Sequence, residues 1–259
     1  MCMLQQLQEQ NPHNRFNIGL YDDFDSKLLQ KSVLKIDLSH EKECVDSAFL
    51  KEQLLSIKED IVFCIAPCNT SYISILESLN YSLISTLVEF ERDSKNDVSD
   101  ELIYVDYAII SGQDYVLDKD SARLHELVWS LAQVSHYGKD LKIDKNRVYD
   151  LYMQWVVNTW HGYASKLLVA VDLLGNIVAF VSLKEVQNSF RIDLLAVHAS
   201  TRNRGIAQSL INKVCLYAQE QKKNLCVRTQ AENRAAIRLY EKNGFIQKSF
   251  NLMYHKIKE

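Results

Sequence analysis

Residues 192–210, IDLLAVHASTRNRGIAQSL, contain the change of pattern that decides the fold. The apolar run that ends at His198 is typical of a strand, the polar residues after it are typical of a loop, and helical spacing of apolar residues begins after Gly205. The first turn of a helix leaves backbone N–H groups free at the positive end of the helix dipole. Gly205 lets an anion approach the backbone, and Arg202 and Arg204 add positive charge. This pattern predicts a pyrophosphate site.

Downstream of residue 100, strands and helices alternate, which predicts an α/β fold. The stretch 166–198 indicates an antiparallel meander, so the expected sheet is mixed and mostly antiparallel, with helices on its faces. The expected strands are 102–110, 166–173, 177–184, 190–198, 225–230 and 246–257, and the expected helices are 119–134, 144–160, 205–221 and 233–243.

A smaller α/β unit is expected before residue 98. Its expected strands are 32–38, 61–66 and 81–90, and its helices are 47–57 and 72–79. The polar stretch 92–100 is the best candidate for a linker, which predicts an accessory domain over 1–98 and a second domain over 99–259. Segments 76–90 and 240–254 share a helix, turn and long-strand layout, so we hypothesise that the first unit is a partial copy of the second.

Composition excludes several classes of protein. The 259 residues include 30 basic and 33 acidic side chains, and a net charge of −3 provides no basic surface for nucleic acid. The start of the sequence lacks the basic and apolar parts of a secretory signal, and the most apolar window, 167–183, is too interrupted to span a membrane. The six cysteines form no CxxC pair, so we expect free thiols and no metal site in a cytoplasmic protein.

A second motif allows a family to be identified. Residues 227–245, VRTQAENRAAIRLYEKNGF, resemble the closing motif of the GNAT superfamily of N-acetyltransferases, and residues 202–207, RNRGIA, resemble its acetyl-CoA loop. The resemblance covers about 103–259. Within the superfamily, the segments 135–140 and 152–162 resemble the branch that contains TDP-fucosamine N-acetyltransferase, although His136 stands where that branch typically has Arg.

The resemblance implies acetyl-CoA as co-substrate. Strand 192–197 would splay from its neighbour beside the pantetheine arm, and Tyr240 would act as the general acid that protonates the CoA sulfur. Asn233 is expected to be a helix N-cap and, by the resemblance, a contact to the cofactor. The expected cofactor-binding residues are Leu195, Ala196, Val197, Arg202, Asn203, Arg204, Gly205, Ile206, Ala207 and Asn233.

The amine side of the site is less defined by sequence. Asp193 occupies a position where several members of the superfamily place an acid that acts on the amine through water, but a surface carboxylate is an equally good interpretation. Strand alternation would place Asp193 on the face of Leu195 and Val197. His136 and Tyr137 are candidates for substrate contact by position.

The sequence therefore predicts an acetyl-CoA-dependent N-acetyltransferase that acts on a small-molecule amine, with the amino group of a nucleotide-linked sugar as the leading substrate. A peptide or polyamine acetyltransferase is the first alternative, and a non-catalytic acetyl-CoA-binding module is the second. No membrane partner is expected, and a homodimer is left open, including one in which the first unit is mainly a dimerisation scaffold.

Overall fold

The computed structural model describes residues 19–39, 46–98 and 106–258, and within them one mixed sheet of ten strands. The strands lie in the order β1-β2-β3-β10-β4-β9-β8-β7-β6-β5. Only β2–β3 and β8–β9 pair in parallel, so the expected mixed, mostly antiparallel sheet is confirmed. The strands are β1 Leu20–Tyr21, β2 Val33–Asp37, β3 Ile61–Pro67, β4 Ser82–Arg92, β5 Tyr107–Ser111, β6 Lys166–Asp172, β7 Ile177–Val186, β8 Ser189–Val197, β9 Asn224–Gln230 and β10 Ile246–Ile257.

The longer helices lie where the sequence pattern predicts them. Helices α2 and α6 were not expected, because seven and four residues are too few to show a helical period. Of the expected strand 102–110, residues 102–105 lie outside the described part of the chain. The helices are α2 Asp23–Leu29, α3 Ser47–Ser56, α4 Thr70–Ser78, α5 Ala122–Val134, α6 His136–Lys139, α7 Lys145–Asn158, α8 Ile206–Glu220 and α9 Arg234–Lys242.

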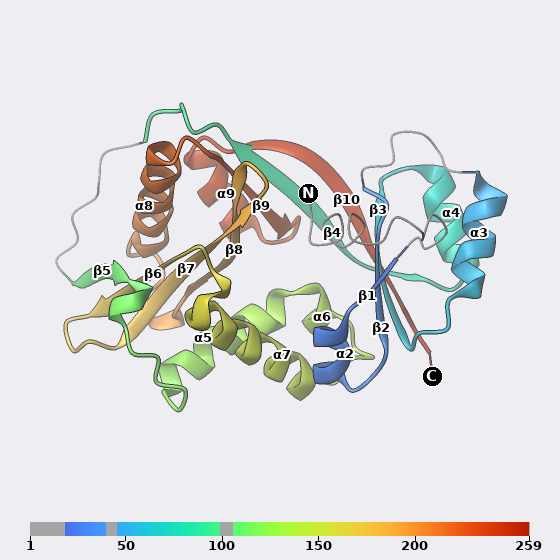
Figure 1. Ribbon diagram of the computed structural model, residues 1–259, viewed down its shortest axis with the longest axis horizontal. Coiled ribbons are helices and arrows are strands. Elements are labelled where there is room, and N and C mark those ends of the chain that lie inside the picture. The colour runs from blue at the N-terminus through green and yellow to red at the C-terminus, as the bar shows by residue number, and fades with distance from the viewer. Residues whose placement is uncertain (1–18, 40–45, 99–105, 259) are drawn as a thin grey trace.

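Strands β4 and β10 join the two halves of the sheet by crossing between them (Figure 1). Strand β4 follows α4 and pairs with β9 of the second half, and β10 follows α9 and pairs with β3 of the first half. The two strands also pair with each other. Each half therefore has the same order of elements: two parallel strands joined by a helix, a second helix, and a long strand that enters the other half. This repeated topology agrees with the hypothesis of a partial copy.

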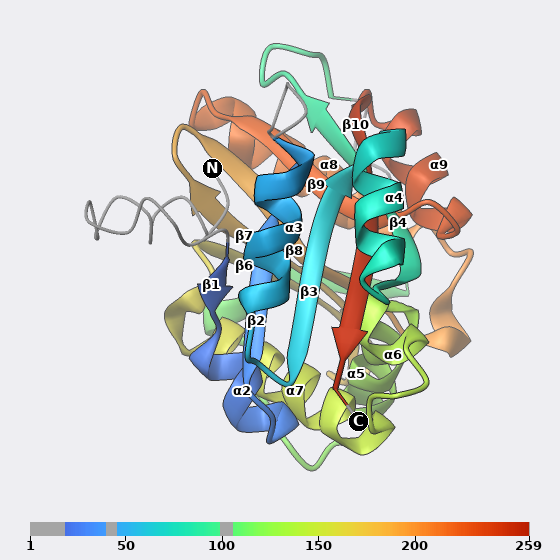
Figure 2. The ribbon, with the colours of Figure 1, turned by 90° about the vertical axis from the view of Figure 1, so that its right-hand side faces the viewer.

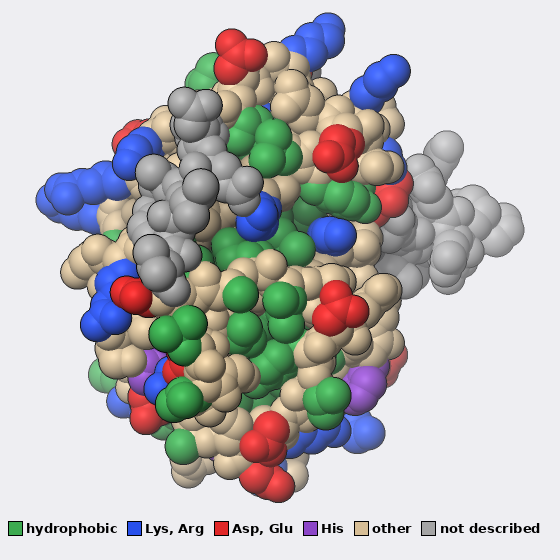
Figure 3. Space-filling model, turned by 90° about the vertical axis from the view of Figure 1, so that its left-hand side faces the viewer, with side chains coloured by type: hydrophobic (Ala, Val, Ile, Leu, Met, Phe, Trp, Pro, Cys, Tyr) green, Lys and Arg blue, Asp and Glu red, His purple; other side chains and the backbone are tan. Residues whose placement is uncertain are grey.

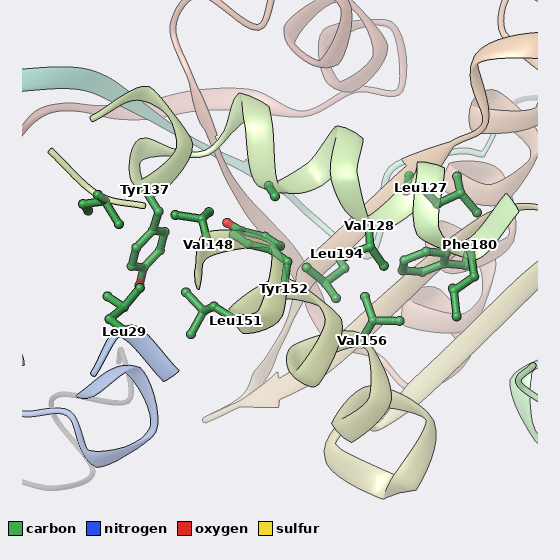
Figure 4. Packing of buried hydrophobic residues seen from close by; sticks show 14 of the residues in the cluster. Leu29, Leu127, Val128, Tyr137, Val148, Leu151, Tyr152, Val156, Phe180 and Leu194 are labelled. Atoms are coloured by element: carbon green, nitrogen blue, oxygen red, sulfur yellow. The ribbon is translucent and has the colours of Figure 1, made fainter. Parts of the chain in front are cut away.

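Three apolar clusters fill the layers on the two faces of the sheet. Helices α2, α5, α6 and α7 cover one face along both halves, and Leu29 and Tyr137 lie beside Val148 and Leu151 of α7 (Figure 4). On the opposite face, α3 and α4 cover the first half (Figure 2), and α8 and α9 cover the second. The core on the first face therefore belongs to both halves.

The edge strand β5 is partly exposed to solvent. Residues of β5 are only partly buried, in contrast to the buried centre of β6 and β7. Figure 3 shows this side of the molecule, where hydrophobic side chains gather in the hollowed middle of the face. Among the helices of the described residues, none is long and apolar enough to cross a membrane.

A buried polar cluster ties the first half to α6 of the second. The hydroxyl of Tyr137 donates to Asp25 Oδ2 at 2.6 Å, and Lys35 Nζ lies 2.6 Å from the same carboxylate and 2.8 Å from Asp22. Burial raises the pKa of Asp25, although the Lys35 charge opposes the shift. Removing one member of such a cluster would leave the other charges buried and unpaired, so the cluster fixes the position of α6.

Arg92, the first residue of the polar stretch 92–100, is the last residue of β4 and only 2% exposed. Its guanidinium donates to the carbonyl oxygens of Asn243, Asp93, Asn96 and Asp97 at 2.8, 3.2, 2.8 and 2.9 Å. These bonds compensate for burying the charge, and they fix the chain after β4 against the end of α9. The division of the chain at residue 98 stays a prediction.

We predict that the two halves unfold together, because β4 and β10 lie in the middle of one shared sheet. Hydrogen exchange followed by mass spectrometry across a urea series should give the same midpoint for peptides from β3 and from β7. Two separate midpoints would show that each half is stable alone, and would contradict the prediction.

Candidate active site

A gap opens between β8 and β9 in the middle of the second half. The two strands pair only from Ser189 with Asn224 to Ile192 with Val227. Beyond this point β8 continues beside β7 to Val197, and β9 continues beside β4 to Gln230. The strands therefore diverge, as the resemblance implied for strand 192–197.

Backbone groups of β8 face this gap. The N–H of His198 donates to the carbonyl of Val178 in β7 at 2.8 Å, and alternate residues of an antiparallel strand direct their backbone groups to the same neighbour. The N–H and C=O groups of Leu195 and Val197 therefore point away from β7, towards the gap. An extended chain of amides, such as a pantetheine arm, could form with these groups the hydrogen bonds that a neighbouring strand would otherwise form.

A β-bulge at Asp193 changes the alternation of side chains along β8. Ile192 lies opposite Leu183 and Leu194 lies opposite Ser182, so Asp193 has no partner residue in β7. The Ser182 hydroxyl accepts a hydrogen bond from the Leu194 N–H at 3.1 Å and compensates for the break in the ladder.

The bulge makes one expectation wrong. Asp193 was expected on the face of Leu195 and Val197, but these two side chains pack on the cluster beneath α8, whereas Asp193 turns to α7. Its carboxylate lies 2.9 Å from Arg191 Nη2 and accepts from Trp155 Nε1 at 3.3 Å, and its side chain is 6% exposed. The carboxylate is therefore held by fixed partners.

The loop between β8 and α8 has the geometry of an anion site. Asn203 and Gly205 have φ values of 60° and 78°, so the chain turns sharply before α8 begins at Ile206. Among the described residues no side chain caps this helix, which leaves its first N–H groups available. Arg202, Asn203 and Arg204 are exposed around the loop, whereas the Ile206 side chain is buried, so Ile206 could contact a ligand only through its backbone.

His198 holds the start of this loop to α5, a contact that sequence reasoning missed. Its Nε2 lies 2.6 Å from Glu126 Oε2, and its Nδ1 lies 2.8 Å from Ser200 Oγ. A lone histidine at the end of a strand gives no sign of a partner that lies 72 positions earlier in the chain.

Tyr240 belongs to the apolar cluster on the α8 and α9 face, against which Leu195 and Val197 also pack. Its side chain is 4% exposed, packs near Phe90 and Phe245, and has no hydrogen-bond partner for its hydroxyl among the described residues. Burial raises the pKa of Tyr240, so the phenol stays protonated at neutral pH. The N-cap expected at Asn233 is confirmed, because its Oδ1 accepts from the Ala236 N–H at 3.2 Å.

On the other face of the sheet, two histidines and an aspartate form a chain of hydrogen bonds. Asp140 Oδ2 lies 2.8 Å from His255 Nδ1, and His255 Nε2 lies 2.9 Å from His136 Nδ1. Burial lowers the pKa of His136 well below its usual range, and the neighbouring His255 acts in the same direction. Burial also lowers the pKa of His255, although Asp140 opposes the shift. Both rings are therefore neutral at pH 7.

The carboxylate sets the tautomers of both neutral rings. Asp140 accepts a hydrogen bond, so His255 carries its proton on Nδ1 and offers the Nε2 lone pair to His136 Nδ1–H. His136 Nε2 then remains without a proton. Tyr137, in contrast, is buried with its hydroxyl bonded to Asp25, so the two neighbouring candidates for substrate contact have different surroundings.

Helix α6 brings His136 towards the end of β9. Lys139, one turn after His136, forms an ion pair with Glu232, which lies two residues after the end of β9. Glu232 also lies 3.4 Å from the Ser85 hydroxyl of β4. No group of three or more His, Cys, Asp or Glu side chains able to hold a metal is found in residues 19–39, 46–98 and 106–258.

Comparison with known proteins shows what the second half of the chain resembles. A sequence model described as an acetyltransferase (GNAT) domain matches residues 163–247. The spore coat polysaccharide biosynthesis protein SpsD of Bacillus subtilis (strain 168) is 26% identical over 137 residues, which are 52% of this chain and 47% of that protein. The chain thus spans about half the length of this curated relative.

Solved structures resemble the whole fold. A GCN5-related N-acetyltransferase from Sphaerobacter thermophilus is 14% identical, with a TM-score of 0.59 over 92% of this chain and 75% of its own. A tandem GNAT protein from the clavulanic acid biosynthesis pathway is 10% identical, with a TM-score of 0.54 over 87% and 75% of the two chains. The second agrees with the arrangement of two related halves. Residues 163–247 are therefore similar to an acetyltransferase domain of the GNAT family.

Proposed function

We propose that the protein transfers an acetyl group from acetyl-CoA to a primary amine, and that this amine belongs to a nucleotide-linked amino sugar. The observation that carries the proposal is the gap between β8 and β9, which leads from the backbone groups of Leu195 and the N–H of Val197 to the start of α8. One extended ligand with a pyrophosphate at one end and amides along its length suits both parts. Acetyl-CoA is such a ligand.

The reaction needs a proton donor and a proton acceptor on opposite sides of the thioester. The amine nitrogen attacks the carbonyl carbon, the C–S bond breaks, and the phenol of Tyr240 donates its proton to the departing thiolate. A backbone N–H at the gap stabilises the oxyanion that forms before the C–S bond breaks. The Tyr240 ring is buried and its hydroxyl has no hydrogen-bond partner among the described residues, which supports this role.

His136 is the group that we propose to accept the proton from the amine. The unprotonated Nε2 supports this role, and so does the position of α6 beside the end of β9. When Nε2 takes up the proton, the Nδ1 proton can pass to His255, where Asp140 balances the charge. Asp193 is a weaker candidate, because Arg191 and Trp155 already hold its carboxylate.

The sugar as acceptor rests on a narrower basis. The segments 135–140 and 152–162 resemble the sugar-nucleotide branch, and the name of the SpsD relative places that protein in polysaccharide biosynthesis. We propose the same class of substrate here, in the cytoplasm, where sugar nucleotides and acetyl-CoA are both available.

Release of the free CoA thiol tests the reaction and the acceptor together. The expected result is thiol release from acetyl-CoA that depends on a TDP-linked amino sugar, with no release when the sugar carries a hydroxyl in place of the amine. Release with peptides or polyamines alone would contradict the sugar acceptor but keep the transferase. Binding of acetyl-CoA without release across all amine classes would favour a non-catalytic module.

Replacing Tyr240 with Phe tests the proton donor. The ring still packs between Phe90 and Phe245, so the fold and the KM for acetyl-CoA should stay unchanged, while kcat falls by about tenfold to a thousandfold. The matched control is Tyr217→Phe in α8, where the ring packs on Phe190 away from the gap. A kcat equal to that of the control would remove Tyr240 from the mechanism.

The pH dependence of activity tests His136. Because its pKa is lowered, His136 stays unprotonated as pH falls through about 6.5, so its contribution to kcat/KM should be lost only below that pH. In His136→Gln the loss of kcat/KM that protonation of His136 causes at low pH should disappear. The pH dependence that comes from ionisation of the amine substrate should remain, and kcat/KM should fall by about tenfold or more. His161→Gln, at an exposed position, is the control. Identical pH profiles for wild type and His136→Gln would contradict the assignment.

A further inference from the structure

Arg228 is the first residue of β9 beyond its last pair with β8, so it lies where the gap begins. Leu225 and Val227 of the same strand pack in the cluster beneath α8. Alternation along the strand therefore places the Arg228 side chain on the opposite face of the sheet, the face that α5, α6 and α7 cover. This side chain is 23% exposed, so a ligand can reach it, and none of the roles above uses it.

Two carboxylates from the first half of the chain flank the Arg228 guanidinium. Its Nε lies 3.4 Å from Glu89 Oε1 of β4, and its Nη1 lies 3.6 Å from Asp37 Oδ2 at the end of β2. Three strands separate β2 from β9, and in a flat sheet these two strands would lie about 19 Å apart. Two side chains cannot span that distance, so the sheet is concave on this face, and Asp37, Glu89 and Arg228 form one polar cluster across it.

Asp37 contributes an oxygen that has no hydrogen bond. Its side chain is 5% exposed, and Ser39 donates to Oδ1 both from its N–H, at 3.0 Å, and from its hydroxyl. Oδ2 is buried and has no hydrogen-bond partner among residues 19–39, 46–98 and 106–258, because 3.6 Å is too long for a hydrogen bond from Arg228. A buried carboxylate oxygen that accepts nothing is costly. A ligand that donates a hydrogen bond would satisfy it.

The chemistry of the polar cluster suits a neutral ligand with several hydroxyl groups. Glu89 Oε2 accepts from the Ser249 hydroxyl of β10 at 3.2 Å, and Asn251 donates to the same hydroxyl at 3.2 Å. One guanidinium beside two carboxylates leaves the cluster negative, so it would repel a phosphate. Each hydroxyl of a sugar both donates and accepts, and it can therefore bond to the carboxylates and to the guanidinium at once.

The polar cluster also lies at a suitable distance from the donor. Leu195, whose backbone faces the gap, is three residues beyond the last pair of β8 with β9, and Arg228 is one residue beyond it. The two levels differ by two residues, which is about 7 Å along a strand. A single sugar ring with its substituents spans this length, so its hydroxyls can lie on the cluster while its amine faces the thioester.

We propose that Asp37, Glu89 and Arg228 form the subsite that binds the hydroxyl groups of the acceptor's sugar ring. The inference rests on the proposed function, since it assigns the part of the acceptor next to the amine. The two carboxylates exclude the diphosphate of a sugar nucleotide from this subsite. Strands β2 and β4 of the first half thereby take part in acceptor recognition.

Calorimetric titration of the full chain with a TDP-linked amino sugar tests the subsite without turnover. Asp37→Asn and Glu89→Gln should each weaken binding about tenfold, because each removes a charged acceptor. An analogue whose ring hydroxyls are replaced by hydrogen should bind wild type about tenfold more weakly, and should bind Asp37→Asn as well as it binds wild type. The control is Glu185→Gln in β7, which removes a carboxylate that pairs with Lys223 and should bind both ligands as wild type does.

Three results of the titration would overturn the proposal. The first is equal affinity of wild type, Asp37→Asn and Glu89→Gln for the amino sugar. The second is a loss in the variants that is as large for the analogue without hydroxyls, because such a loss would come from a change of structure. The third is binding of spermidine that weakens in Asp37→Asn, because the cluster would then be a site for cations.

Thiol release separates this inference from the proposed function. If the amino sugar is acetylated, Asp37→Asn should raise the KM for the sugar about tenfold and leave the KM for acetyl-CoA unchanged. Acetylation with an unchanged KM for the sugar overturns the subsite and keeps the function. If the amino sugar binds through the polar cluster but is not acetylated, the function fails and the subsite stands. If no amino sugar binds, both fail.

Discussion

Four backbone pairs hold β8 beside β9, and the candidate site depends on where these pairs stop. Beyond Ile192 each strand keeps only its outer neighbour, so the inner backbone groups of β8 have no partner strand. In the interior of a sheet such groups are costly unless a ligand or water satisfies them. The bulge at Asp193 begins at the same point and turns the side chains that follow. The site is therefore an interruption of the sheet.

The crossed strands β4 and β10 explain how a sheet can be interrupted and remain stable. Because β4 supplies the outer neighbour of β9, the first half of the chain supports the site, although its sequence carries no acetyltransferase motif. Phe63 of β3, also in the first half, packs edge-on against the His136 ring, and His255 of β10 is hydrogen bonded to it. Deleting residues 1–98 would remove β4 from the middle of the sheet, so that experiment cannot separate an accessory role from a structural one.

Local pattern predicted most of this structure, because the information lay within single elements. The apolar period predicted nearly all strands and the longer helices, and Gly205 and Asn233 marked the starts of two helices through positive φ and capping. The bulge at Asp193 was missed because strand alternation assumes an unbroken ladder. The chain from Asp140 to His136 and the contact from His198 to Glu126 were missed because they join residues that are distant in sequence.

The most direct test of the account is residue-by-residue amide exchange of β8 with and without acetyl-CoA. The N–H groups of Leu195 and Val197, which face the gap, should exchange quickly in the free protein and slowly once acetyl-CoA is added. Phe190 and Ile192, where β8 is paired on both sides, should be protected in both states. Exchange at Leu195 and Val197 that saturating acetyl-CoA leaves unchanged would contradict the claim that the gap is the donor site.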